Sequence, residues 1–190
     1  IMSVYNMILK ARGNPFIVSN KNELKNIEIL ILPGVGSYDN AIIKLKKKGF
    51  YDLIIKHVDD GKVLLGICLG FQLLFRGSDE GNLDGFGFFD DKLTQFKPIN
   101  NFKKLHMGWN YIHTSNYLFS SYNKNKFYFV HKYYSKLVDS DFCSSTCNYS
   151  EKFCSSVEKN NIIGVQFHPE KSHNYGLSFF KKFIQKYAQL

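Results

Sequence analysis

Apolar residues recur along the chain at two spacings, which predict alternating helices and strands. Ser3 is a suitable helix N-cap, and apolar residues follow it at helical spacing until Gly13, namely Val4, Met7, Ile8 and Ala11. Two short apolar stretches, over residues 16–18 and 27–32, have the length of strands. The first fifth of the chain therefore predicts a helix followed by two strands.

The same patterns continue to the end of the chain. Further helices are expected over residues 38–48, 51–60 and 175–187, and further strands over 62–66, 126–131 and 162–167. Between residues 81 and 158, short aromatic runs and turn signals favour antiparallel pairing. Strands that alternate with helices are typical of an α/β sheet, and the absence of a repeat or linker predicts one domain over residues 1–190.

Composition narrows the possible classes of protein. With 190 residues and 44% hydrophobic residues the chain can bury a core, and no apolar run is long enough to cross a bilayer. The net charge of +9 comes from scattered lysines, so nucleic-acid binding is not expected. Four cysteines without CxxC spacing indicate a reducing cytoplasm, and no histidine pair has the spacing of metal ligands, so neither a metal nor a cofactor is expected.

Residues 65–70, Leu-Gly-Ile-Cys-Leu-Gly, form the strongest local signal for chemistry. Glycines two positions before and two after Cys68 permit a strained turn from a strand into a helix that carries Phe71, Leu73, Leu74 and Phe75. Amide N–H groups at the helix start would lower the thiol pKa and stabilise an oxyanion. A lone buried cysteine is more often structural, but the flanking glycines favour a nucleophile.

A thiol nucleophile needs a base that a third group holds in one tautomer. His168 follows the strand predicted over residues 162–167, and Pro169 stiffens the turn that returns Glu170 towards the imidazole. Taken alone, His-Pro-Glu is compatible with an ordinary surface turn. Together with Cys68, it predicts a catalytic triad of Cys68, His168 and Glu170.

Residues 32–36, Leu-Pro-Gly-Val-Gly, place two glycines at the end of another predicted strand. The glycines free the intervening peptide to rotate, so that it can direct an N–H group at a developing oxyanion. We assign the oxyanion hole to the backbone N–H groups of Val35 and Leu69. An ordinary strand-to-helix turn is the alternative for this segment alone.

The order and separation of these three motifs resemble those of the class I glutamine amidotransferases. The resemblance implies a three-layer α/β sandwich with a mostly parallel central sheet, which hydrolyses glutamine to glutamate and ammonia. It places Gly34, Gly36, Gln72 and His131 at the glutamine site.

Residues 106–110, 127–131 and 168–172 further resemble the glutaminase subunit of imidazole glycerol phosphate synthase. That subfamily passes ammonia to a separate (β/α)₈ cyclase subunit, which makes imidazole glycerol phosphate and an aminoimidazole carboxamide ribotide in histidine biosynthesis. Trp109, Tyr128 and Lys171 match positions near the subunit interface, although two core aromatics and a solvated charge would explain them equally well.

Two departures from the family pattern stand out. Family members begin with a strand and an Asp-Tyr-Gly-x-Gly-Asn turn, which precede the position matching Ile1, so the first strand is expected to be absent from this chain. Lys132 follows His131 where relatives usually carry a small hydroxyl residue near the glutamine.

Three alternatives stay open on the sequence. A paralogous amidotransferase could supply ammonia for amidination of a surface sugar, because fold and site do not fix the pathway. A cysteine hydrolase outside the amidotransferases would also use Cys68 and His168. A catalytically silent binding subunit would need none of the three triad residues.

Overall fold

The computed structural model describes residues 1–98 and 102–188. In those ranges the α-helices are α1 (Met2–Lys10), α2 (Tyr38–Lys47), α3 (Tyr51–Asp59), α4 (Leu69–Leu73) and α5 (His173–Tyr187), with 3₁₀ turns η1 (Lys21–Asn26), η2 (Tyr117–Phe119) and η3 (Pro169–Lys171). The strands are β1 (Ile29–Gly34), β2 (Val63–Cys68), β3 (Phe75–Ser78), β4 (Phe89–Gln95), β5 (His106–His113), β6 (Asn125–His131), β7 (Tyr133–Tyr134), β8 (Cys143–Asn148), β9 (Lys152–Lys159) and β10 (Ile162–Val165).

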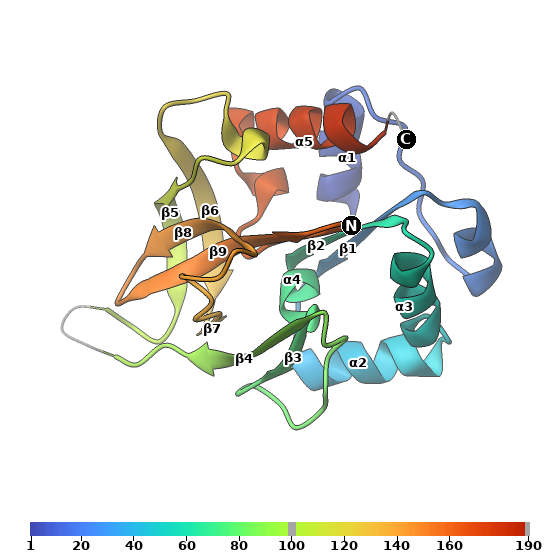
Figure 1. The fold of residues 1–190 in the computed structure, drawn as a ribbon, viewed down its shortest axis with the longest axis horizontal. Coiled ribbons are helices and arrows are strands. Elements are labelled where there is room, and N and C mark those ends of the chain that lie inside the picture. The colour runs from blue at the N-terminus through green and yellow to red at the C-terminus, as the bar shows by residue number, and fades with distance from the viewer. Residues whose placement is uncertain (99–101, 189–190) are drawn as a thin grey trace.

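Helices cover both faces of the main sheet, which is the three-layer α/β arrangement that the sequence predicts. Figure 1 shows α1 and α5 on one side of the sheet and α2, α3 and α4 on the other. Strand β2 is buried along its whole length, because its successive side chains alternate between the two layers. Leu65 packs with α1 and α5, whereas Leu64 packs with α2, α3 and α4.

The main sheet of the described residues is mixed, with strand order β1-β2-β10-β9-β8-β5-β6. Pairing is parallel only among β1, β2 and β10, and it is antiparallel from β10 to β6. The α/β class is confirmed, but a mostly parallel sheet is not found. Parallel neighbours require long crossovers, whereas β8, β9 and β10 follow one another through short turns, which join antiparallel strands.

Three local predictions were wrong. Residues 16–18 form no strand, because an extended apolar stretch becomes a strand only where a neighbouring edge pairs with it. Helix α1 begins at Met2, so its N-cap is Ile1, and Ser3 is the second residue of the helix and not its cap. Helix α4 ends at Leu73 and Phe75 opens β3, because these apolar residues are buried among neighbours on several sides rather than along one helical stripe.

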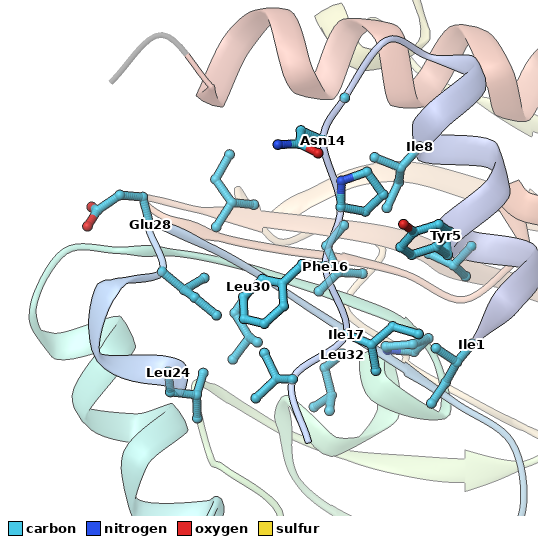
Figure 2. Close-up of a pocket in the computed structure, with 18 of the residues that line it drawn as sticks. Ile1, Tyr5, Ile8, Asn14, Phe16, Ile17, Leu24, Glu28, Leu30 and Leu32 are labelled. Atoms are coloured by element: carbon cyan, nitrogen blue, oxygen red, sulfur yellow. The ribbon is translucent and has the colours of Figure 1, made fainter. Parts of the chain in front are cut away.

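An apolar cavity of about 580 Å³ lies beside β1. Figure 2 shows side chains from α1, from the stretch that contains Phe16 and Ile17, and from β1 converging on it. Residues of α5 complete its wall. None of Cys68, His168 and Glu170 lines this cavity, so it does not mark the predicted reaction site.

Candidate active site

Cys68 lies at the apex of a strained turn where β2 ends and α4 begins. Its φ of 54° and ψ of −104° fall where a residue with a Cβ is rarely found. A Cβ on Gly70 would lie 1.7 Å from the carbonyl oxygen of Leu32, and one on Gly66 would lie 2.7 Å from the carbonyl oxygen of Gly70. The two glycines that flank Cys68 are therefore required by close backbone contacts, as the sequence predicts.

His168 follows the short strand β10 and lies at the same end of the sheet as Cys68. Its backbone N–H donates to the carbonyl oxygen of Tyr128 over 2.8 Å, and Ser172 Oγ donates to its carbonyl oxygen over 2.6 Å. The same Ser172 Oγ accepts the N–H of Tyr128 over 3.0 Å. Buried Ser172 thus ties the histidine to β6, a role that the sequence did not suggest.

The imidazole of His168 is held by Glu170. His168 Nδ1 and Glu170 Oε1 lie 2.7 Å apart, and both side chains are almost fully buried. His168 Nε2 is buried and forms no hydrogen bond within the part of the chain that the structure describes. A histidine with one nitrogen fixed by a carboxylate and the other left open is arranged to exchange a proton with a reacting group.

Electrostatics favour the protonated form of His168. Burial opposes its charge, but interactions with Cys68 and then with Glu170 outweigh burial and raise the pKa of His168 to about 9. The imidazole is therefore an imidazolium at neutral pH.

Two buried glutamines extend the contacts of the thiol. Gln166 Nε2 is 4.0 Å from Cys68 Sγ, and Gln72 Nε2 donates to Gln166 Oε1 over 3.2 Å. Gln72, which the resemblance places at the glutamine site, is only 5% exposed, and its side-chain amide is hydrogen-bonded to Gln166. Gln166 was missed, although it lies two residues before His168 in the same motif.

The end of β1 lies directly beside the Cys68 turn. Gly34 is the register partner of Cys68, and a Cβ on Gly34 would lie 3.0 Å from the Cβ of Leu69. Val35 is 80% exposed and Gly36 has a φ of 115°, which a glycine adopts without strain. The structure therefore brings the predicted oxyanion residues Val35 and Leu69 to adjacent backbone segments.

His131, also predicted at the glutamine site, is buried at the end of β6. Its Nδ1 lies 2.8 Å from the carbonyl oxygen of Tyr133, and its Nε2 lies 3.0 Å from His106 Nδ1. Both ring nitrogens are engaged with protein groups. The neighbouring Val130 carbonyl oxygen lies 4.0 Å from Cys68 Sγ, so the backbone of this stretch borders the thiol.

Trp109, Tyr128 and Lys171, predicted near a subunit interface, are brought together on one surface. Trp109 and Tyr128 are directly paired across β5 and β6, with ring centroids 6.1 Å apart. Trp109 is 39% exposed and stacks on His173, whose ring centroid is 5.3 Å away. Lys171 is exposed in η3, two residues before His173.

The described residues contain neither a cluster of metal ligands nor a helix suited to a membrane. Residues 1–98 and 102–188 contain no group of three or more histidine, cysteine, aspartate or glutamate side chains arranged to hold a metal ion. No helix in those ranges has the length and apolar character needed to span a bilayer.

Comparison with known proteins decides the family. The sequence profile described as "Glutamine amidotransferase class-I" matches residues 4–186. The chain belongs to the class I glutamine amidotransferases. This match covers all three motifs described above, at Gly34, Cys68 and His168.

Individual relatives of this amidotransferase agree with the family match. "Imidazole glycerol phosphate synthase subunit HisH 2" of Methanococcus maripaludis is 44% identical over 97% of this chain and 93% of its own length. "Imidazole glycerol phosphate synthase subunit HisH 1" of Campylobacter jejuni is 41% identical over 90% of this chain and 87% of its own. Among solved structures, "Structure of PurLQS from Thermotoga maritima" includes a chain of similar fold, with a TM-score of 0.75, 20% identity and coverage of 97% of this chain and 92% of that one.

Proposed function

We propose that this chain is the glutaminase subunit of an imidazole glycerol phosphate synthase, with Cys68, His168 and Glu170 as its catalytic triad. The observation that carries the proposal is the buried His168–Glu170 pair, 2.7 Å apart, at the same sheet end as Cys68. Its open Nε2 and its raised pKa are what a proton donor to a leaving ammonia needs. The HisH subunits that match most of the chain support this assignment.

The first half of the reaction forms a thioester. The Cys68 thiolate attacks the side-chain carbonyl carbon of glutamine. The carbonyl oxygen becomes an oxyanion, to which the backbone N–H groups of Val35 and Leu69 donate hydrogen bonds. As the C–N bond breaks, the His168 imidazolium gives its proton to the departing nitrogen. Ammonia leaves, and a γ-glutamyl thioester remains on Cys68.

The second half returns the site to its starting state. Neutral His168 takes a proton from a water molecule, whose oxygen attacks the thioester carbonyl. The C–S bond breaks, glutamate leaves, and the thiolate and imidazolium are restored. Glu170 stays ionised throughout and holds His168 in the required orientation.

The partner in this proposal is a (β/α)₈ cyclase subunit that receives the ammonia. The surface of Trp109, Tyr128 and Lys171 is assigned to it, because Trp and Tyr are enriched at protein interfaces and the Trp109 side chain is exposed there beside Tyr128. Tyr128 also accepts the His168 N–H through its carbonyl oxygen. Contact at this surface therefore reaches the catalytic histidine through one hydrogen bond.

The test is glutamate release from glutamine by the chain alone and by the chain mixed with a candidate cyclase and its nucleotide ligand. The proposal predicts strong stimulation by the liganded cyclase. A rate that depends on Cys68 but does not respond to the cyclase would indicate that the ammonia acceptor is a sugar precursor instead. Absence of glutamate release in both conditions would leave a silent binding subunit.

A further inference from the structure

Two buried histidines, His106 and His131, face each other across β5 and β6 next to the thiol. They are direct register partners and are 3% and 4% exposed. His106 is stacked between Phe129 and Tyr149, with ring centroids 4.7 and 4.3 Å away. Both nitrogens of each ring have a hydrogen-bond partner, as most buried polar groups do.

The hydrogen-bond partners of the two histidines fix which ring nitrogen donates and which accepts in each of the three bonds. The Tyr133 carbonyl oxygen, 2.8 Å from His131 Nδ1, can only accept, so the proton is on Nδ1 and His131 Nε2 accepts. His106 Nδ1 therefore donates to it over 3.0 Å, and His106 Nε2 accepts from Asn110 Nδ2 over 3.3 Å. Burial lowers the pKa of His106 to about 4 and that of His131 to about 3, which keeps both rings neutral and each tautomer fixed.

This relay ends at the stretch that borders the nucleophile. The bond from His131 to Tyr133 spans Lys132 and holds the turn between β6 and β7. Just before that turn, the Val130 carbonyl oxygen lies 4.0 Å from Cys68 Sγ. The relay therefore connects His106 to the backbone that borders the thiol.

We propose that His106, acting through His131, is a positioning residue that sets the place of residues 130–133 beside Cys68 and so tunes glutamine binding at the thiol. This inference rests on the proposed glutaminase function. Among the described residues, His106 forms no hydrogen bond with Cys68 or with His168. It reaches the neighbouring strand through its hydrogen bond to His131 and its stacking on Phe129.

Two substitutions at the same position separate positioning from packing. In His106→Asn, the side-chain amide can still donate to His131 Nε2. In His106→Phe, the ring fits the aromatic surroundings but cannot donate, so the buried His131 Nε2 loses its partner. KM and kcat for glutamine with saturating partner, the rate of Cys68 alkylation by iodoacetamide in the free chain, and Tm are measured for both.

The expected result is a rise of about tenfold or more in KM and a changed alkylation rate for His106→Phe, with kcat less affected. His106→Asn is expected to stay within about threefold of the parent in both measurements. KM and alkylation close to the parent values in folded His106→Phe would overturn the proposal. Equal impairment of both variants, in proportion to lost Tm, would do so as well.

A second variant covers the case in which His106→Phe does not fold. Asn110 is half-buried at the far end of the relay, and Asn110→Leu removes the donor to His106 Nε2. We expect its KM to rise severalfold, and an unchanged KM would contradict the relay. Because alkylation needs no glutaminase activity, a parent chain that releases no glutamate would refute the proposed function while the alkylation rates still test the positioning.

Discussion

Replacing Gly70 by alanine should disable the thiol without unfolding the protein. The added Cβ would lie 1.7 Å from the Leu32 carbonyl oxygen, so α4 and β1 must separate by about 1.3 Å to reach the 3.0 Å below which such contacts are not found. The backbone of Gly70 fixes the position of the Cβ, and the Leu32 oxygen is a backbone atom, so no side-chain rotation can relieve the clash. The displacement acts on Gly70, two residues after Cys68, and on strand β1, which ends at Gly34 just before Val35.

The size of the effect follows from that displacement. A misplacement of about 1 Å in a catalytic group costs about a hundredfold in rate, so kcat/KM for glutamine should fall by about a hundredfold or more in Gly70→Ala. Overpacking should cost about 1–3 kcal/mol of stability, which a domain with a stability of about 5–15 kcal/mol survives. The protein should therefore remain folded while its activity collapses.

The assay combines glutamate release with urea unfolding, and Gly77→Ala is the matched control. Gly77 is also buried, but a Cβ there would meet only the Lys92 side chain at an ordinary 3.7 Å. We expect the control to keep kcat/KM within about threefold of the parent. Gly70→Ala that retains kcat/KM within the same range would refute the account of the strained turn.

Three further predictions concern the histidine, the thiol and the surface. Glu170→Gln removes an interaction that raises the pKa of His168, so the alkaline limb of the pH–activity profile should move below about pH 9. Gln166→Leu removes a donor to Cys68 Sγ and should slow thiol alkylation by about tenfold near neutral pH. Trp109→Ala should weaken cyclase binding by about 2 kcal/mol or more while basal glutamate release and Tm stay near the parent values.

Each of these three predictions has its own contradicting outcome. An unmoved alkaline limb in Glu170→Gln, unchanged alkylation in Gln166→Leu, or unchanged cyclase affinity in Trp109→Ala would each contradict the stated role. Gln185→Leu is the control for Gln166, because Gln185 accepts a hydrogen bond from Tyr117 and forms none with the thiol.

The raised pKa of His168 also links folding to pH. A base whose pKa is higher in the folded state stabilises that state when protonated. The contribution is complete below the unfolded value of 6.5 and is lost as the pH rises through about 9. Urea unfolding of the parent and of His168→Ala across that range would measure it, and parallel stability curves would contradict the shift.

The parts of the site that the sequence predicted are those fixed by local geometry. The glycine spacing around Cys68 and the Pro169 turn before Glu170 constrain the backbone within a few residues, and the structure places these groups as those constraints require. The α/β layers follow in the same way from the apolar spacing of helices and strands.

The parts that were missed depend on residues far apart in the chain. The bonds of Gln72 to Gln166 and of His106 to His131 arise only when separate strands are assembled. The antiparallel half of the sheet was expected, but its strand order was not. The predicted strand over residues 16–18 failed for the same reason, because the pairing of an extended segment depends on its neighbours.

The most direct test of the account is glutamate release by Cys68→Ser and by Cys143→Ser in the presence of the liganded cyclase. Cys143 is half-buried in β8 and lies outside the proposed triad, so it provides a cysteine control. The account predicts a loss of about a thousandfold or more for Cys68→Ser, with Cys143→Ser close to the parent. Glutamate release by Cys68→Ser at the parental rate would contradict it.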